Sequence, residues 1–462
     1  MTEAMATSID GSTFSFHAPV DGLELQPGSY ASVGEHLGQV HTVELMAEER
    51  GSVHGRGMLL EGGVAPFHDV TIGRADEARV AAWLEETRPK RAALDVGELT
   101  TEAGVRFLLD AGGFDRHTFF CGQSGSGKSY ALGAVLEQLL LETSLRIIVL
   151  DPNSDFVNIG SLRDGVDGDV ANRYRRAAEG VVVRRSGAPG SERLHVRFTD
   201  FGAEEQAAVL RLDPIRDWEE YGVLVDLIEQ GLEADASSAG EIAERLMQAS
   251  DPERRALGAR LRNLGVHRWP IWSTGDEGSI QDLAGGGGPR GLVIDLGSLA
   301  TPGEKAIAAE SVLAALWRRR AERDPVLIVI DEAHNVCPRE PADEVTALAT
   351  ERAAQIAAEG RKFGLYLLVS TQRPQRVNEL VVSQCDNLVL MRLGSAADRA
   401  YLAEAMSFAP AALVDRAGAF RPGEALVAGK IASHPAFVRF GPRVSEEGGS
   451  DVPATWAESE ST

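Results

Sequence analysis

The octapeptide GQSGSGKS at residues 122–129 constrains the fold more than any other feature of this chain. It lies between a short apolar run at 118–121 and a helix-like run at 130–141. In such a loop, successive backbone N–H groups point inward and can surround phosphate oxygens. The positive end of the following helix adds to the attraction. The sequence therefore predicts a buried strand, a phosphate-binding P-loop and a helix, in that order.

Side chains of this loop have distinct expected roles. Lys128 is expected to reach the β- and γ-phosphates of a nucleotide, and the Ser129 hydroxyl to ligate Mg²⁺. The glycines permit a close approach of phosphate that a Cβ would obstruct. We predict ATP and Mg²⁺ as cofactors. The expected nucleotide-binding residues are Gly122, Gln123, Ser124, Gly125, Ser126, Gly127, Lys128, Ser129 and Tyr130.

A second motif supplies the acidic half of such a site. The apolar run 326–330 ends in Asp331 and Glu332. In a P-loop enzyme the first carboxylate holds the Mg²⁺ shell, and the next is placed to polarise the attacking water. We therefore predict Asp331 and Ser129 as metal ligands and Glu332 and Lys128 as catalytic residues. The two motifs lie far apart in the sequence, so their strands must be neighbours in one sheet.

Two further positions follow from strand and helix spacing. Gln372 comes just after the strand predicted at 365–370, where a polar side chain would lie beside the γ-phosphate. It is a candidate sensor, with simple loop hydrogen bonding as the alternative. Arg361 and Lys362 follow a helix-like run at 343–358. On spacing alone these two cations are interpreted as solvated surface residues.

Alternation of strands and helices after residue 115 defines the fold class. Continuous apolar strands separated by helices indicate a parallel sheet that is buried on both faces. The prediction is an α/β fold with a RecA-like P-loop ATPase core over 93–198 and 290–443. The apolar strands are expected at 118–121, 145–150, 291–296, 325–330, 365–370 and 387–392.

Three other segments flank or interrupt this core. Short strand-like runs broken by Gly, Pro and Asp favour a small N-terminal β-barrel over 1–92, with roughly the first 15 residues flexible. Residues 199–275 are helical in period and are interpreted as an insertion. The Gly-, Ser- and Glu-rich tail 444–462 is predicted to be disordered.

The charge and the cysteine content limit which binding partners and which cellular compartment are expected. Acidic residues outnumber basic ones, 69 to 46, for a net charge of −23. This argues against an outer surface coated for DNA binding, although a local basic channel would suffice. No long apolar run or signal peptide is found, so no membrane association is expected. The three cysteines are sparse, which favours a reduced, cytoplasmic protein.

Together these motifs resemble the HerA family of hexameric DNA-translocating ATPases, within the FtsK/HerA superfamily. The resemblance covers about residues 25–443. The matching pieces are GQSGSGKS (122–129), DPNSDF (151–156), VIDL (293–296), IVIDEAHN (328–335), EGRKFG (359–364) and STQRP (370–374).

The resemblance implies roles that spacing alone does not give. Arg361 becomes a catalytic arginine finger that acts on the neighbouring subunit, and Gln372 becomes the sensor. Asp151 and Asp155 match an acidic motif near the active site. The family's DPHGE is DPNSD here, which leaves the role of Asp155 open. The family also implies a homohexamer with duplex DNA in its central channel and a nuclease or other effector docked on one face.

The leading hypothesis is a ring-forming, ATP-driven DNA translocase or helicase that hydrolyses ATP at subunit interfaces. It would work with a nuclease or other effector in DNA-end processing or anti-phage defence. The alternative is a regulatory or scaffold ATPase ring that assembles and activates an effector. A third hypothesis is a conjugation- or secretion-type motor. The candidate basic contacts to DNA are Arg173, Arg175 and Arg176, with a solvated helix face as their alternative interpretation.

Overall fold

The computed structural model describes residues 4–46, 51–189, 192–230, 239–273 and 278–449. The chain divides into two compact units, each described here by itself. The first contains 1–147 and 313–443, and the second contains 148–312 and 444–462. Among the described residues, no helix is both long and apolar enough to span a bilayer.

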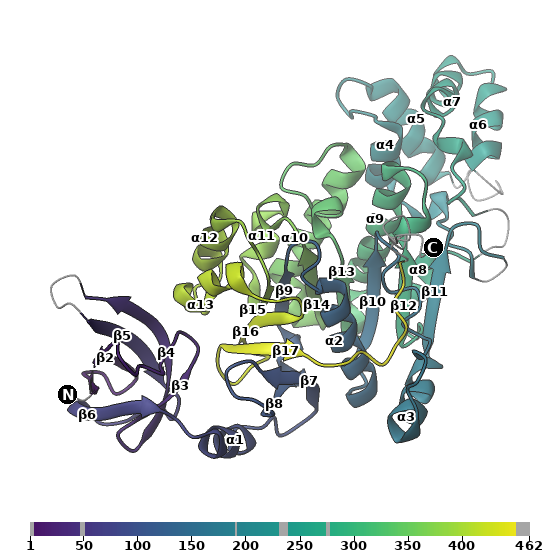
Figure 1. Cartoon of the computed structure of the whole chain (residues 1–462). Helices are drawn as coiled ribbons and strands as arrows, with labels where there is room; N and C mark the ends of the chain where they lie inside the picture. The colour runs from purple at the N-terminus through teal and green to yellow at the C-terminus, as the bar shows by residue number, and fades with distance from the viewer. Residues whose placement is uncertain (1–3, 47–50, 190–191, 231–238, 274–277, 450–462) are drawn as a thin grey trace, which may run out of the picture. The chain divides into compact units, whose positions relative to one another are not determined.

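Six antiparallel strands at the N-terminus close into a barrel in the order β1-β2-β5-β4-β3-β6, as the sequence predicts (Figure 1). Strand β1 and the start of β2 fall within the stretch expected to be flexible, and instead they pair with each other and with the rest of the barrel. The strands are β1 (Met5–Ser8), β2 (Thr13–Pro19), β3 (Tyr30–Val33), β4 (His36–Leu45), β5 (Ser52–Leu59) and β6 (Phe67–Arg74).

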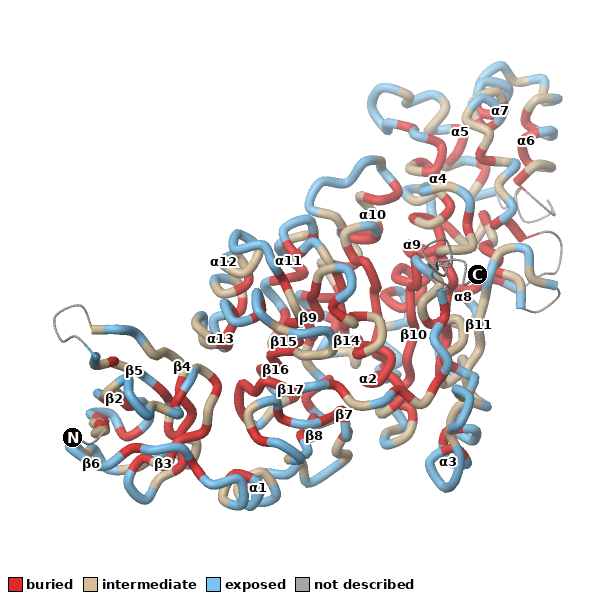
Figure 2. The backbone as a smooth tube through the Cα atoms, in the orientation of Figure 1, coloured by how far each residue is buried: buried red, intermediate tan, exposed pale blue. Residues whose placement is uncertain are grey.

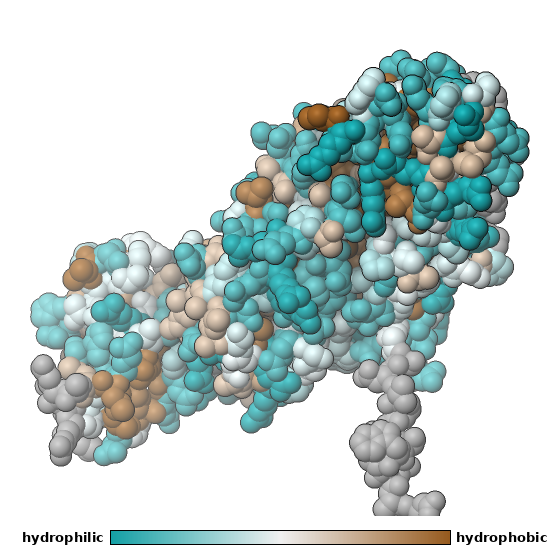
Figure 3. Space-filling model, turned by 90° about the horizontal axis from the view of Figure 1, so that it is seen from above, coloured by the Kyte–Doolittle hydropathy of each residue, from teal (hydrophilic) through white to brown (hydrophobic). Residues whose placement is uncertain are grey.

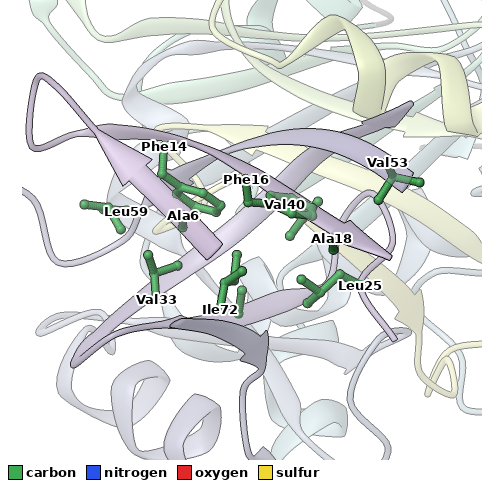
Figure 4. Packing of buried hydrophobic residues seen from close by; sticks show 11 residues of the cluster. Ala6, Phe14, Phe16, Ala18, Leu25, Val33, Val40, Val53, Leu59 and Ile72 are labelled. Carbon is green, nitrogen blue, oxygen red and sulfur yellow. The ribbon is translucent and has the colours of Figure 1, made fainter. Parts of the chain in front are cut away.

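The interior of the barrel is filled by side chains that alternate along its strands. In β2, Phe14, Phe16 and Ala18 are buried while their neighbours are more exposed. Figure 4 shows the two phenylalanine rings gathered with Val40 and Ile72 inside the barrel. This alternation places one face of each strand in the core.

The barrel and the sheet of the first unit are joined by helix α1 (Glu77–Glu86) and by buried polar contacts. The hydroxyl of Tyr30 lies 2.6 Å from Nε2 of His434, and Gln39 Nε2 donates to the carbonyl of Pro435 at 2.8 Å. Burial lowers the pKa of His434 to about 3, with a contribution from nearby His41. The imidazole of His434 is therefore neutral at physiological pH.

The sheet of the first unit has the order β13-β14-β9-β15-β16-β17-β7-β8. Its first four strands are parallel, as predicted, and the pairings from β15 through β8 are antiparallel. The strands are β13 (Val326–Ile330), β14 (Leu365–Thr371), β9 (His117–Cys121), β15 (Cys385–Met391), β16 (Glu424–Gly429), β17 (Ala436–Phe440), β7 (Ala93–Leu99) and β8 (Arg106–Asp110).

The wholly parallel sheet that the sequence indicates is thus a mixed sheet. A short turn joins β16 to β17, and a connection this short can make only an antiparallel pair. The parallel strands are the buried ones: every residue of β9 and β13 is buried, as the red segments of Figure 2 show. Buried parallel strands give a rigid base for the residues that follow them.

Helices of the first unit connect these strands. The helix after the P-loop begins at Lys128, and the helix before β14 begins after Asp343, whose side chain accepts a hydrogen bond from the Thr346 amide. The helices are α2 (Lys128–Glu142), α10 (Glu344–Glu359), α11 (Glu379–Val382), α12 (Ala396–Ala405) and α13 (Ala411–Asp415).

The second unit contains the parallel pair β11 and β12, and helices α4 to α7 occupy the predicted helical insertion. In the tail, Ser445 bridges to Leu162, and residues from 450 onward lie outside the described residues. Strand β10 and helix α9 cross the boundary between the units. The elements are β10 (Arg146–Asp151), α3 (Gly168–Ala178), β11 (Val181–Arg185), α4 (Ala203–Leu210), α5 (Trp218–Glu229), α6 (Ala239–Met247), α7 (Pro252–Leu264), α8 (Ile280–Ala284), β12 (Gly291–Asp295) and α9 (Pro302–Arg318).

Candidate ATPase site

Strand register brings the separate sequence motifs to one edge of the sheet. Val369 lies opposite Ile330, and Thr371 lies opposite Cys121. Because β13, β14 and β9 are parallel, residues directly after these strands emerge at the same edge, where α/β proteins bind their ligands. These residues are Asp331, Gln372 and Gly122.

The backbone of the P-loop shows why it requires glycine. Gly125 has φ +70° and Gly127 has φ +88°, in the left-handed region that disfavours residues with a Cβ. A Cβ on Gly122 would lie 2.7 Å from Ser126 Oγ and 2.8 Å from the Cβ of Met391. The loop leads directly into α2, so the positive end of the helix dipole faces the loop. This arrangement fits a bound phosphate.

Lys128 lies at the centre of a buried charge cluster. Its Nζ donates to Asp331 Oδ1 at 2.8 Å and to Ser370 Oγ at 2.9 Å, and it lies 3.2 Å from Glu332 Oε1. Burial by itself would lower the pKa of this ammonium, but the attraction of Asp331 and Glu332 outweighs it and raises the pKa. Lys128 is therefore charged, and its three partners hold it at the mouth of the P-loop.

Glu332 is held by several donors. The side-chain amide of Gln372 donates to its Oε1 at 2.7 Å, and His334 Nδ1 lies 3.2 Å from its Oε2. Burial would raise the pKa of this carboxyl, yet His334, Lys128 and Gln372 together lower it to about 2. The residue has φ 42°, an uncommon conformation for a side chain other than glycine. This bend turns the chain sharply at the end of β13.

Sequence reasoning missed two members of this cluster, Ser370 and His334. His334 Nδ1 lies 3.0 Å from Thr371 Oγ1 as well as near Glu332. Both missed residues lie within segments quoted for the family resemblance, next to predicted site residues. Their proximity to those residues in the sequence was the available signal, but neither residue has a chemistry that by itself identifies a role.

The site fits a magnesium ion. Asp331 is fully buried, and among the described residues its Oδ2 finds no hydrogen-bond donor. A buried carboxylate oxygen of this kind suits a hard cation with oxygen ligands. Ser129 is the second residue of α2 and belongs to the same loop. Two protein ligands suffice because Mg²⁺ keeps several waters and takes phosphate oxygens.

Arg361 does not join this cluster. It lies in a short 3₁₀ helix at residues 360–363, before β14, whereas Gln372 follows the other end of that strand. Seven strand residues span about 23 Å at roughly 3.3 Å each, so the Arg361 guanidinium does not reach the P-loop of its own chain. Its NH1 lies 3.5 Å from Asp386 Oδ2, and its side chain is 41% exposed.

The acidic motif after β10 lies in the second unit, where Asp151 organises a loop. Its Oδ1 accepts a hydrogen bond from the Asp155 amide at 3.0 Å, and its Oδ2 accepts one from the Phe156 amide at 2.8 Å. Ser154, within the same loop, donates to Asp295 at 2.7 Å. These contacts give Asp151 a structural role within its unit.

The candidate DNA-contacting arginines also lie in the second unit, on α3. Arg173, Arg175 and Arg176 are exposed, while Ala171 and Tyr174 of the same helix are buried. The three cations therefore share the solvent side of the helix, in agreement with the interpretation of a solvated helix face. Their contact with DNA stays a prediction.

Comparison with known proteins agrees with this site. Residues 94–269 match the family model described as the central domain of helicase HerA. Over these residues the chain is similar to the HerA central domain. The resemblance predicted from the motifs is thereby confirmed, and with the P-loop and paired carboxylates in place the chain is a P-loop ATPase.

Two relatives and one solved structure indicate how far this similarity extends. The chain is 23% identical to the DNA double-strand break repair helicase HerA of Pyrococcus furiosus over 399 residues, 75% of this chain and 69% of that protein. It is 30% identical to the DNA double-strand break repair helicase HerA of Sulfurisphaera tokodaii over 167 residues, which are 34% of this chain and 33% of that protein. VirB4 of Thermoanaerobacter pseudethanolicus is similar with a TM-score of 0.53 at 15% identity, covering 77% of this chain and 98% of that one. This last similarity shows the fold alone.

Proposed function

We propose that this chain is one subunit of a homohexameric ring that hydrolyses ATP between subunits and thereby translocates or unwinds duplex DNA. The observation that carries this proposal is the division of the predicted catalytic residues. Lys128, Glu332 and Gln372 meet at one edge of the sheet, and Arg361 lies at the opposite end of β14. A ring would bring the Arg361 end of one subunit against the P-loop of the next.

Nucleotide binding starts from the buried charge cluster. The triphosphate enters the P-loop and accepts hydrogen bonds from the first amides of α2. Lys128 then exchanges the carboxylates of Asp331 and Glu332 for the β- and γ-phosphate oxygens. Asp331 and Ser129 would hold Mg²⁺, which would neutralise charge on the phosphates. Release of Lys128 leaves Glu332 with its partners Gln372 and His334.

Hydrolysis then depends on the ionised carboxylate of Glu332. Hydrogen bonds from His334 and Gln372 lower its pKa and favour the charged form, so it can accept a hydrogen bond from the attacking water and orient it. Gln372 holds the carboxylate in place from the neighbouring strand. Arg361 of the adjacent subunit stabilises the charge that develops on the transferring phosphoryl group.

Support for DNA as the substrate comes from the relatives, since the Pyrococcus furiosus and Sulfurisphaera tokodaii proteins are named as DNA repair helicases. The charge of this chain limits where DNA can bind. The net charge is −23, and hydrophilic side chains predominate on the face shown in Figure 3. DNA must therefore contact a local basic surface, which a central channel would provide.

The proposed setting is the cytoplasm, with a nuclease or other effector docked on one face of the ring. The physiological role would be DNA-end processing or anti-phage defence. This part of the proposal rests on the HerA resemblance.

The rate of ATP hydrolysis with and without duplex DNA tests the proposal. We expect the wild type to be stimulated by DNA, and Glu332→Gln to bind ATP but to lose the stimulated rate. The Glu332→Gln chain is also the control for contaminating ATPases, because it differs by a single atom group. If duplex DNA leaves the wild-type rate of ATP hydrolysis unchanged, the proposed motor function is wrong.

The acidic composition supports a second candidate, a regulatory ATPase ring that assembles an effector. Here nucleotide occupancy would control assembly, and DNA movement would play no part. The same assay separates the two functions if it is repeated with proteins that co-purify with the chain. An ATPase rate that is indifferent to DNA but changed by such a protein would favour the regulatory ring.

A further inference from the structure

Strand β15 lies beside the P-loop strand on the side away from Gln372. Leu390 of β15 lies opposite Cys121 in parallel register, just as Thr371 of β14 does from the other side. The residue that follows β15 therefore emerges at the same sheet edge as the P-loop. That residue is Arg392.

Three hydrogen bonds join this turn to the P-loop. The amide of Gln123 donates to the Arg392 carbonyl at 2.9 Å, and the amide of Gly394 donates to Gln123 Oε1 at 2.7 Å. The guanidinium NH2 of Arg392 donates to the Gly125 carbonyl at 3.1 Å. The side chain of Arg392 is thus in contact with the turn that would surround the phosphates.

The guanidinium of Arg392 has a hydrogen-bond donor that is not used in this structure. Its Nε is buried and, among the described residues, has no hydrogen-bond partner. No carboxylate of the described residues forms an ion pair with the Arg392 guanidinium. Lys128, in contrast, lies against Asp331 and Glu332. An unpaired buried donor on a charged group is costly, and so is a partly buried cation without an anion.

We propose that Arg392 binds the polyphosphate chain of the nucleotide from the β15 side of the P-loop. The proposal rests on the ATPase function and adds a phosphate-binding residue to it. On nucleotide binding, the guanidinium exchanges the Gly125 carbonyl for phosphate oxygens, which supply the missing anion and the missing acceptor. Its planar array of N–H donors suits two phosphate oxygens at once.

The competing explanation is that Arg392 only tethers the P-loop through Gly125. A tether needs one N–H donor and no charge, so Arg392→Gln would preserve it. A phosphate contact needs the positive charge, so Arg392→Lys would retain part of it and Arg392→Gln would lose it. These two substitutions therefore separate the explanations.

Equilibrium titration with a fluorescent ATP analogue, in the presence of Mg²⁺ and without DNA, measures the effect. Each substitution is made in Glu332→Gln, so that hydrolysis does not disturb the binding curve. ADP and AMP compete in parallel titrations. The matched control is Arg376→Gln, which removes an exposed arginine from the turn after β14.

We expect Arg392→Gln to weaken ATP and ADP binding by roughly 10- to 100-fold, the range for hydrogen bonds to charged groups. Arg392→Lys is expected to lose less, AMP binding to change little, and Arg376→Gln to bind like its parent. Unchanged ATP affinity in Arg392→Gln would overturn the proposal. An equal loss for AMP and ADP would also overturn it, because it would indicate a distorted loop.

If Arg392→Gln fails to fold, as judged by loss of its thermal transition, Arg392→Lys decides. Lysine lacks the planar fork, so a measurable loss of ATP affinity is expected, and parental affinity would contradict the proposal. The outcome is distinguishable from failure of the proposed function. If Arg392 contributes to ATP binding but DNA does not change the rate of hydrolysis, the Arg392 proposal holds and only the proposed motor function is contradicted.

Discussion

The side-chain amide of Gln372 donates a hydrogen bond of 2.7 Å to Oε1 of Glu332, across the ends of two adjacent parallel strands. The backbone amide of Gln372 lies 3.3 Å from the other oxygen of the same carboxylate. Both carboxylate oxygens are thus held from β14 while Lys128 still contacts the group. When the phosphates draw Lys128 away, Gln372 is expected to keep Glu332 in place.

Gln372→Ala should therefore reduce the turnover number more than it affects ATP binding. Loss of the donor frees the carboxylate to rotate away from the attacking water, and a misplaced catalytic group costs roughly 100-fold in rate. Steady-state kinetics should show kcat reduced by about that factor, with KM for ATP changed by less. Gln375→Ala is the matched control, because Gln375 donates to Asp398 on the exposed surface and does not contact Glu332.

Lys128→Met should lower the free energy of unfolding. It should also reverse the sign of the pH dependence that Glu332 contributes to that free energy. Removing one partner of a buried ion pair costs about 3–5 kcal/mol, because it leaves uncompensated buried charge. In the wild type the pKa of Glu332 is lowered to about 2, so its stabilising effect is present above its ordinary pKa of 4.5 and is lost as pH falls toward 2. In Lys128→Met, burial and repulsion raise this pKa, and acid should stabilise the variant.

Urea denaturation at pH 7.5 and pH 5 measures this difference. The free energy of unfolding of Lys128→Met should rise relative to the wild type at the lower pH. The double substitution Lys128→Met with Glu332→Gln is the control, since it removes the buried carboxylate. A wild-type-like pH response in the single variant would contradict the charge cluster.

Much of the site could be predicted because its functional residues come directly after strands that the sequence identifies as apolar runs. Asp331 and Glu332 follow a continuous apolar run, and Gln372 follows another, so their meeting required only that the strands be parallel neighbours. Arg392 could not be found this way. It reaches the P-loop through the pairing of β15 with β9, and nothing in the local sequence specifies which strand lies on that side.

The fold class was predicted, but two features of the topology were not. Short turns join β16 to β17 and β7 to β8 and make these two pairs antiparallel, whereas an apolar strand pattern does not reveal the direction of a strand. Residues at the N-terminus were expected to be flexible, yet Phe14 and Phe16 alternate with polar residues in β2 and are buried. That alternation was visible in the sequence.

The contact between barrel and sheet should weaken in acid. The pKa of buried His434 is lowered to about 3, so between pH 6.5 and 3 the unfolded chain binds a proton that the folded chain does not. Stability therefore falls as pH decreases through this range, by about 1.4 kcal/mol per pH unit from this residue. Denaturation curves at pH 7.5 and 5 should show a smaller loss of stability for His434→Gln, whose amide can still form a hydrogen bond with the Tyr30 hydroxyl. An equal loss in both proteins would assign the effect elsewhere, for example to buried His117, whose pKa is lowered to about 4.

Arg361→Ala should abolish hydrolysis in a ring of identical subunits but not when it is mixed with a complementary variant. Arg361 lies at the opposite end of β14 from the P-loop, so its effect must cross to a neighbour. Homomeric Arg361→Ala and homomeric Lys128→Ala should both be inactive. In a mixture, an intact P-loop of one subunit meets an intact Arg361 of the next at some interfaces, and part of the ATPase rate should return. Lys362→Ala, at the adjacent exposed position, is the control for loss of a positive charge. Normal hydrolysis by Arg361→Ala alone would show that no finger is supplied from this position.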